Sequence, residues 1–127
     1  MTNKNDYKKK VLIVEDNKLL CEMFKIAFHK NGFDIEISLE GENGIKKISV
    51  FKPDLVLLDI MMPGEKNGFD VLKEIRKNMS LDVPVIVNSN MTQDKDIEKA
   101  LKLGANKYLK KSDYTPNKVV EEAKNFV

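Results

Sequence analysis

What this sequence lacks already excludes several classes of protein. Its single cysteine, Cys21, cannot form an intramolecular disulfide and falls among apolar residues at helical spacing, which suits a reducing cytosol. No apolar run approaches the roughly 18 to 20 residues that cross a bilayer. The N-terminal ten residues lack the hydrophobic core of a signal peptide. Glycine and proline are sparse, which disfavours a disordered or fibrous chain. We therefore expect a cytoplasmic globular protein without membrane insertion.

The charge balance does not suggest direct binding to nucleic acid. Lysine and arginine number 22 against 20 acidic residues, for a net charge of +2, whereas nucleic-acid binding domains are usually clearly basic. A chain of 127 residues has the size of one ordinary domain. We expect residues 1–9, with their three consecutive lysines, to be a solvated N-terminal lead-in and residues 10–127 to form a single domain.

Two kinds of apolar segment alternate along the chain, without internal repeats or low-complexity linkers. Short runs rich in β-branched residues predict five strands, over residues 11–14, 33–39, 55–58, 85–87 and 107–109. Between and after them, apolar residues recur three and four positions apart, which predicts five helices, around residues 20–27, 45–48, 71–79, 97–101 and 119–126.

Strict alternation of strand and helix implies a parallel sheet that is covered by helices on both faces. The fold class is therefore predicted to be α/β: a doubly wound, five-stranded parallel sheet in a flavodoxin-like (βα)5 three-layer sandwich. The second strand alternates in polarity like an edge strand, whereas the first, third and fourth are apolar throughout. The strand order 2-1-3-4-5 fits this pattern, and ligands in such folds bind beyond the carboxyl ends of the strands.

Polar residues follow the predicted central strands at that edge. They are Glu15 and Asp16 after the first strand, Asp59 after the third, Ser89 after the fourth, and Lys110 and Lys111 after the fifth. Any one of the acidic residues could simply cap the next helix, as Asp16 or Asn17 could do here. Two carboxylates about 4 Å apart, however, repel by roughly 4 kcal/mol at an effective dielectric near 20. Three convergent carboxylates therefore favour a compensating cation.

Hard oxygen ligands with room for several waters suit Mg²⁺. A metal beside a lysine and a hydroxyl is suited to phosphoryl transfer, in which the protein mostly positions and neutralises oxygens. The nucleophile is either a water or one of the carboxylates. Asp59 is the candidate, because it ends the most buried strand, while Glu15 and Asp16 share a metal-binding turn.

Four motifs in order resemble the response-regulator receiver domain, the fold of the chemotaxis regulator. "VLIVEDN" resembles the acidic pair of that family, "PDLVLLDIMMP" its phosphoacceptor loop, "PVIVNSN" its hydroxyl-bearing fourth strand, and "GANKYLKKS" its aromatic and lysine positions. The resemblance runs from about Lys10 to Phe126.

The resemblance implies a two-component signal transduction function. Asp59 would accept a phosphoryl group, as an aspartyl phosphate, from a sensor histidine kinase or a phosphotransfer protein. The cofactor would be Mg²⁺, held by Asp16 and Asp59, by Glu15 through water, and by the backbone carbonyl of Met61.

The resemblance also implies a switch. Ser89 would reach toward the phosphoryl oxygens and Lys111 would pair with them, while Tyr108 would turn inward as Ser89 moves. The charge added by a phosphoryl group biases such a bistable element. The face formed by the fourth helix, fifth strand and fifth helix would then change, and an unknown output protein would read it.

The sequence departs from the family pattern in several places. Lys111 precedes Ser112 where the family usually has a proline, often in a cis peptide. A cis bond before a non-proline residue costs about 3 kcal/mol, so we expect the loop that carries Lys111 to be placed differently.

Asn90 replaces a small residue and is expected to crowd the approach to Asp59, slowing phosphorylation by small donors and hydrolysis. Residues 63–68 are one residue longer than usual and are expected to form a surface loop. Asn88 replaces an apolar residue and has no explanation at this level.

Three other functions compete with this interpretation of the sequence. A Mg²⁺-dependent phosphohydrolase would need an acid/base group two residues after its nucleophile, but Met61 cannot transfer a proton. An FMN-binding flavodoxin would need small residues after the first strand, where "EDNK" would repel phosphate. A receiver-like module that signals without phosphorylation is the last alternative, and Asn90 and Ser112 leave it open.

The chain ends after one predicted final helix, so we expect either a stand-alone regulator or a fragment of a longer protein.

Overall fold

The computed structural model describes residues 8–127, so the expected lead-in lies mostly outside the described residues. Five parallel strands form one sheet in the order β2-β1-β3-β4-β5. They are β1 (Lys10–Val14), β2 (Asp34–Ser38), β3 (Leu55–Leu58), β4 (Val85–Ser89) and β5 (Lys107–Lys110). The predicted fold class and strand order are therefore confirmed.

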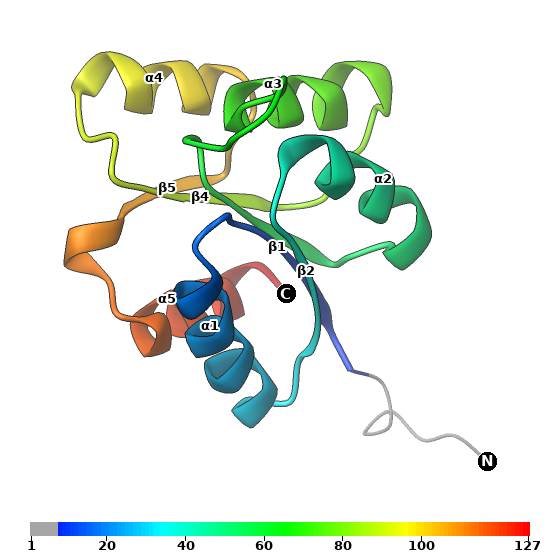
Figure 1. Ribbon diagram of the computed structural model, residues 1–127, viewed down its shortest axis with the longest axis vertical. Helices are drawn as coiled ribbons and strands as arrows, with labels where there is room; N and C mark the ends of the chain where they lie inside the picture. Colours follow the sequence, from blue (N-terminus) through cyan, green and yellow to red (C-terminus); the bar gives the residue numbers. More distant parts are fainter. Residues whose placement is uncertain (1–7) are drawn as a thin grey trace.

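Helices cover both faces of the sheet (Figure 1). They are α1 (Lys18–Lys30), α2 (Gly41–Phe51), α3 (Gly68–Lys73), α4 (Asp94–Lys102) and α5 (Pro116–Ala123). Helices α1 and α5 lie on one face, and α2, α3 and α4 lie on the other. The π-helix η2 (Glu74–Asn78) continues α3, and the 3-10 turns η3 (Lys111–Asp113) and η4 (Lys124–Phe126) follow β5 and α5. Every helix within residues 8–127 is too short or too polar to traverse a bilayer.

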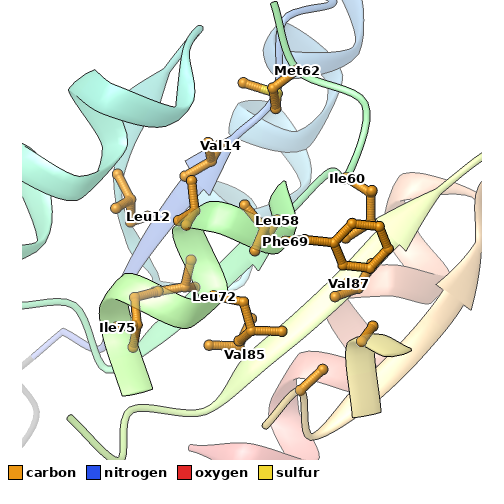
Figure 2. Close-up of a cluster of buried hydrophobic side chains, with 14 of the residues drawn as sticks. Leu12, Val14, Leu58, Ile60, Met62, Phe69, Leu72, Ile75, Val85 and Val87 are labelled. Carbon is orange, nitrogen blue, oxygen red and sulfur yellow. The ribbon is translucent and has the colours of Figure 1, made fainter. Parts of the chain in front are cut away.

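Two apolar clusters hold the three layers together. One lies between the sheet and α2, α3 and α4, where Leu12, Leu58 and Val85 pack against Leu72 and Ile75 (Figure 2). The other lies beneath α1 and α5. Its members include Val11, Ile13, Phe24, Phe28, Leu57, Ile86, Leu109 and Val119. Successive strand residues point to opposite faces, so each central strand contributes to both clusters. Strand β3 is consequently apolar throughout, and β1 is apolar from Val11 to Val14, as strands buried on both faces must be.

Local signals set the helix boundaries close to where the sequence predicts them. Asn17 caps α1 by accepting a hydrogen bond from the Leu20 amide at 3.0 Å, and Thr115 caps α5 with proline following it. The lengthened loop at residues 63–67 ends in a capping box, in which Asn67 and Asp70 bond to each other's backbone amides. This loop therefore leads into α3 in a defined conformation.

One residue of α3 fixes the chain beside the carboxyl end of β3. The Gly68 amide donates to the Ile60 carbonyl at 2.8 Å, and a Cβ atom at Gly68 would lie 2.3 Å from the Asp59 carbonyl oxygen. No real Cβ approaches a backbone oxygen so closely, so only glycine fits. The start of α3 is thereby held against the residue that ends the most buried strand.

Arg76, in η2, holds together two loops at the opposite edge of the sheet. Its guanidinium donates to the carbonyls of Leu81 and Val83, both at 2.8 Å, and of Gly104, at 2.9 and 3.1 Å. It also reaches the Asn106 side chain at 3.0 Å. Burial lowers the pKa of Arg76, although the charge of Asp82 opposes that effect. The planar guanidinium thus replaces solvent for several loop carbonyls at once.

Candidate functional site

Three carboxylates meet at the carboxyl edge of the sheet, as the sequence predicts. Glu15 and Asp16 follow β1, and Asp59 follows β3, the neighbouring strand. One oxygen of each lies within 4.8 Å of the others. Glu15 and Asp59 are 3% and 4% exposed, whereas Asp16 is exposed. Because Asn17 supplies the cap of α1, capping does not explain Asp16.

Backbone and side-chain bonds hold the Asp59 carboxylate. The Asp59 amide donates to the Val14 carbonyl at 3.0 Å, which extends the β1–β3 ladder by one residue. Its Oδ1 accepts the Met61 amide at 3.2 Å, and its Oδ2 accepts the Lys111 ammonium at 2.8 Å. The carboxylate is therefore fixed by the end of a buried strand and by a cation from the opposite half of the sheet.

Lys111 bridges two of the acids. Its Nζ lies 2.6 Å from Glu15 Oε1 and 2.8 Å from Asp59 Oδ2, and its side chain is 15% exposed. Burial by itself would lower the pKa of Lys111, but the hydrogen bonds and charges of Asp59 and Glu15 outweigh burial and raise it above its ordinary value. The pairing with Glu15 was not predicted, because sequence order carries no information on how far the lysine reaches across the sheet.

Two bonds also hold the carboxylate of Glu15, from Lys111 and from the Asn17 amide. Burial raises the pKa of Glu15, and the charge of Asp59 adds to that shift. The bonds from Lys111 and from the Asn17 amide, which Oε2 accepts at 3.0 Å, oppose it. The Glu15 carbonyl also lies 3.3 Å from the thiol of buried Cys21. Burial followed by nearby acidic charge raises the pKa of Cys21 to about 11, so the thiol packs beneath the site in its protonated form.

The donor set suits a hard divalent cation. The three carboxylates carry three negative charges and the bridging ammonium neutralises one of them. An open hollow of about 450 Å³ beside them is lined by Asp16, Met61, Asn67 and Met91, among others. Oxygen donors with space for water are what Mg²⁺ requires. The three predicted carboxylate residues are therefore brought together with a chemistry that fits this ion.

A hydroxyl and an aromatic ring are linked through one backbone unit next to the acids. Ser89, at the end of β4, is completely buried, and its Oγ accepts the Met91 amide at 3.3 Å. The Tyr108 hydroxyl donates to the Met91 carbonyl at 2.6 Å, with the Ser89 hydroxyl beside it. Burial raises the pKa of Tyr108. The backbone of Met91 thus connects the predicted hydroxyl to the predicted switch aromatic.

The residues that depart from the family pattern occupy different environments. Asn90 is exposed at the rim, in the loop that leads to α4, and Ser112 is exposed in η3. The Lys111–Ser112 peptide is trans, since no cis bond occurs among the described residues. Asn88 is buried, at 3% exposure, and in the described part of the chain its Oδ1 has no hydrogen-bond partner.

Comparisons with known proteins agree on one family. Residues 11–124 match the response regulator receiver domain. The chain is 35% identical over 117 residues to response regulator SaeR of Staphylococcus epidermidis, covering 92% of this chain and 49% of that protein. It is 33% identical over 113 residues to DNA-binding response regulator MtrA of Mycobacterium tuberculosis, covering 89% and 48%. The chain therefore spans about half the length of these curated relatives.

Solved structures agree with the sequence matches. The receiver domain of Francisella response regulator 1452 superposes with a TM-score of 0.85 at 26% identity, covering 94% of this chain and 96% of that one. The BeF3-activated N-terminal receiver domain of RstA from Klebsiella pneumoniae superposes with a TM-score of 0.84 at 25% identity, covering 93% and 97%.

Proposed function

The chain belongs to the response regulator receiver domain family of two-component systems, and from that premise we propose that Asp59 is its phosphoacceptor. The observation that carries this proposal is the fixed position of the Asp59 carboxylate, at the end of β3 and within 4.8 Å of Glu15 and Asp16. An oxygen of Asp59 attacks the phosphorus of a phosphohistidine. The phosphorus–nitrogen bond breaks, and the histidine, whose other ring nitrogen is protonated, leaves with the electron pair of that bond as a neutral imidazole. The products are an aspartyl phosphate and a free imidazole on the donor.

The role of the acidic residues is to hold Mg²⁺. Asp16 and Asp59 would offer direct carboxylate ligands, Glu15 would bind through water, and the Met61 carbonyl would complete the protein ligands. When bound, the ion neutralises charge on the transferring phosphoryl oxygens. Met61 has no group that could act as an acid or base, so we assign the domain to signalling rather than to turnover of a metabolite.

The remaining site residues then have separate tasks. Lys111 already contacts Asp59 at 2.8 Å and pairs with the phosphoryl group once it arrives. Ser89 donates its hydroxyl hydrogen to a phosphoryl oxygen, and the shared Met91 backbone transmits that movement to Tyr108. The α4-β5-α5 face changes as a result, and an output protein reads the change. Asn90 at the rim slows small phosphodonors and hydrolysis, and Ser112 shapes the loop after Lys111.

The proposal is tested by phosphorylation with Mg²⁺ and either a phosphorylated sensor kinase or a small phosphodonor. We expect an alkali- and hydroxylamine-labile phosphoryl group in the parent protein and none in Asp59→Asn. The matched control is Asp54→Asn, which alters the aspartate at the other end of β3. It should keep the label. Full labelling of Asp59→Asn would refute the assignment, and an unlabelled parent would favour a receiver that signals without phosphorylation.

A further inference from the structure

The side-chain oxygen of Asn88 is buried without a hydrogen-bond partner in the part of the chain that the structure describes. An apolar side chain at this position would avoid the free-energy cost of removing that oxygen from water. Asn88 is 3% exposed, and its Oδ1 accepts no hydrogen bond from any described residue. Buried polar groups in folded proteins almost always have a partner, and an exception calls for an explanation in the function of its surroundings. The surroundings of Asn88 are the site itself.

Asn88 belongs to a row of side chains that crosses the sheet at the level of the acids. Alternation along β4 places Asn88 on the same face as Ile86, which packs beneath α1 and α5. The register pairs Asn88 with Leu109 on β5, and continuing the β3–β4 register by one residue sets it next to Asp59. Glu15 follows on β1. The amide therefore lies between the acids and the strand from which Lys111 starts.

Lys111 passes the end of β4 to reach the acids. It follows β5, yet its Nζ bonds to Asp59 on β3 and Glu15 on β1. Strand β4 lies between β5 and β3 in the sheet. An ammonium group has three N–H donors, of which these carboxylates take two. A withdrawal of the ammonium by about one strand spacing, roughly 4.8 Å, moves it from the β1 acid toward Asn88.

The bridging lysine and a metal ion compete for the same oxygens. A divalent cation held by Glu15, Asp16 and Asp59 would repel the Lys111 ammonium. It would also weaken the attraction between that ammonium and Glu15, the carboxylate that Lys111 contacts at 2.6 Å. A largely buried ammonium that loses one partner requires another acceptor. The unpartnered Asn88 Oδ1 is such an acceptor, on the strand that lies between Asp59 and the start of Lys111.

We propose that Asn88 is a positioning residue: Lys111 exchanges Glu15 for the side-chain oxygen of Asn88 when a divalent cation binds, and it keeps its bond to Asp59. The exchange keeps the ammonium beside the carboxylate that reacts and clears Glu15 for the ion. This inference rests on the metal part of the proposed function and not on phosphoryl transfer.

The matched substitutions are Asn88→Thr and Asn88→Val, which have the same shape but differ in whether they offer an acceptor oxygen. We expect Asn88→Val to bind Mg²⁺ about tenfold more weakly than the parent, because a hydrogen bond to a charged group is lost only in the metal-bound form. Asn88→Thr should stay within about threefold of the parent. Magnesium titrations followed by NMR or calorimetry give these affinities. Thermal unfolding without metal should show Asn88→Val to be at least as stable as the parent.

The dependence on Lys111 separates positioning from a general packing effect. In a Lys111→Met background, the difference between Asn88→Val and Asn88→Thr should disappear. Equal Mg²⁺ affinities of the two single variants would overturn the proposal, and so would a difference that survives Lys111→Met.

A structure of the parent with Mg²⁺ tests the exchange without any substitution. Lys111 Nζ should lie within about 3.2 Å of Asn88 Oδ1 and away from Glu15, and an ammonium still on Glu15 would overturn the proposal. Magnesium titrations that behave as expected in a protein that is never phosphorylated would refute the phosphoacceptor role alone. A parent that binds no Mg²⁺ would overturn both proposals.

Discussion

Replacing Lys111 by methionine should destabilise the metal-free protein by about 3 kcal/mol, because removing one partner of a buried ion pair typically costs 3 to 5 kcal/mol. Lys111 is the cation between Glu15 and Asp59, at 2.6 and 2.8 Å. Without it, two carboxylates whose oxygens lie within 4.8 Å of each other face one another directly. At that separation they repel by about 3.5 kcal/mol for an effective dielectric near 20. The midpoint of thermal unfolding should fall by about 10 °C for a chain of this length.

The size of the effect should depend on pH in a defined direction. Burial raises the pKa of Glu15 in the folded protein above its ordinary value of 4.5 in the unfolded chain. At a pH between the unfolded and the folded pKa, the folded protein therefore binds a proton at Glu15 more tightly than the unfolded chain does. The contribution of Glu15 to stability consequently increases as the pH falls through that window and decreases as it rises. The deficit of Lys111→Met should therefore shrink as the pH is lowered toward 4.5, where the repulsion is relieved.

Urea unfolding followed by circular dichroism measures this deficit, at pH 7.5 with a chelator and again with millimolar Mg²⁺. The ion should restore most of the lost stability, because it replaces the missing positive charge. Lys110→Met is the matched control, since Lys110 is the neighbouring residue in β5 and has no comparable pair among the described ion pairs. If Lys111→Met proved as stable as Lys110→Met with chelator at pH 7.5, the electrostatic reasoning would be refuted.

Further predictions concern the frame around the site. Arg76→Ala should lower the free energy of unfolding by about 3 kcal/mol, because it leaves several partly buried loop acceptors unpaired, and Arg76→Lys should recover only part of this in urea unfolding. Gly68→Ala should destabilise more than Gly32→Ala: its Cβ would lie 2.3 Å from the Asp59 carbonyl oxygen, whereas nothing lies within 4 Å at Gly32, where alanine meets only the cost of a φ of +84°, about 1 to 2 kcal/mol; similar losses would contradict the close-approach argument. Cys21, with a pKa of about 11, should react with iodoacetamide at pH 8 far more slowly in native protein than in urea, and equal rates would place the thiol outside the core.

The strands of the sheet and their order could be predicted from the sequence because the strands carry strong local signals. Unbroken apolar runs mark β1 and β3, and polar alternation marks the edge strand β2, so pattern and tertiary structure coincide. The π-helix η2 was not predicted, because its residues continue the apolar spacing of α3 and nothing in that spacing distinguishes a π-helical turn from an α-helical one. The capping box at Asn67 carries an N-cap signal that could have been read from the sequence, and it explains how the longer loop ends.

The composition of the site was predictable, whereas its internal pairing was not. The convergence of Glu15, Asp16 and Asp59 follows from their place at the ends of neighbouring parallel strands. The bond from Lys111 to Glu15 depends on side-chain reach across the sheet, which no spacing along the chain reveals. Asn88 illustrates the same limit. Its polarity stood out in the sequence, but its unpaired oxygen becomes visible only when burial and partners are known together.

The geometry of the site depends on the pairing register of β4, so the site forms only when this strand is correctly paired. Asn88 and Ser89 are consecutive and point to opposite faces, with Asn88 level with Leu109 and Ser89 level with Lys110. A slip of one residue along β4 would set either Val87 and Asn88 or Ser89 and Asn90 opposite Leu109 and Lys110, while still burying much of the strand. Such a misfolded chain would remain compact with little added exposed surface, yet Ser89 would no longer lie level with Lys110 and Asn88 would no longer lie level with Leu109, beside the acids. Signalling competence would therefore report strand register more sensitively than solubility does, and loss of signalling without aggregation is the phenotype to expect from variants that loosen this strand.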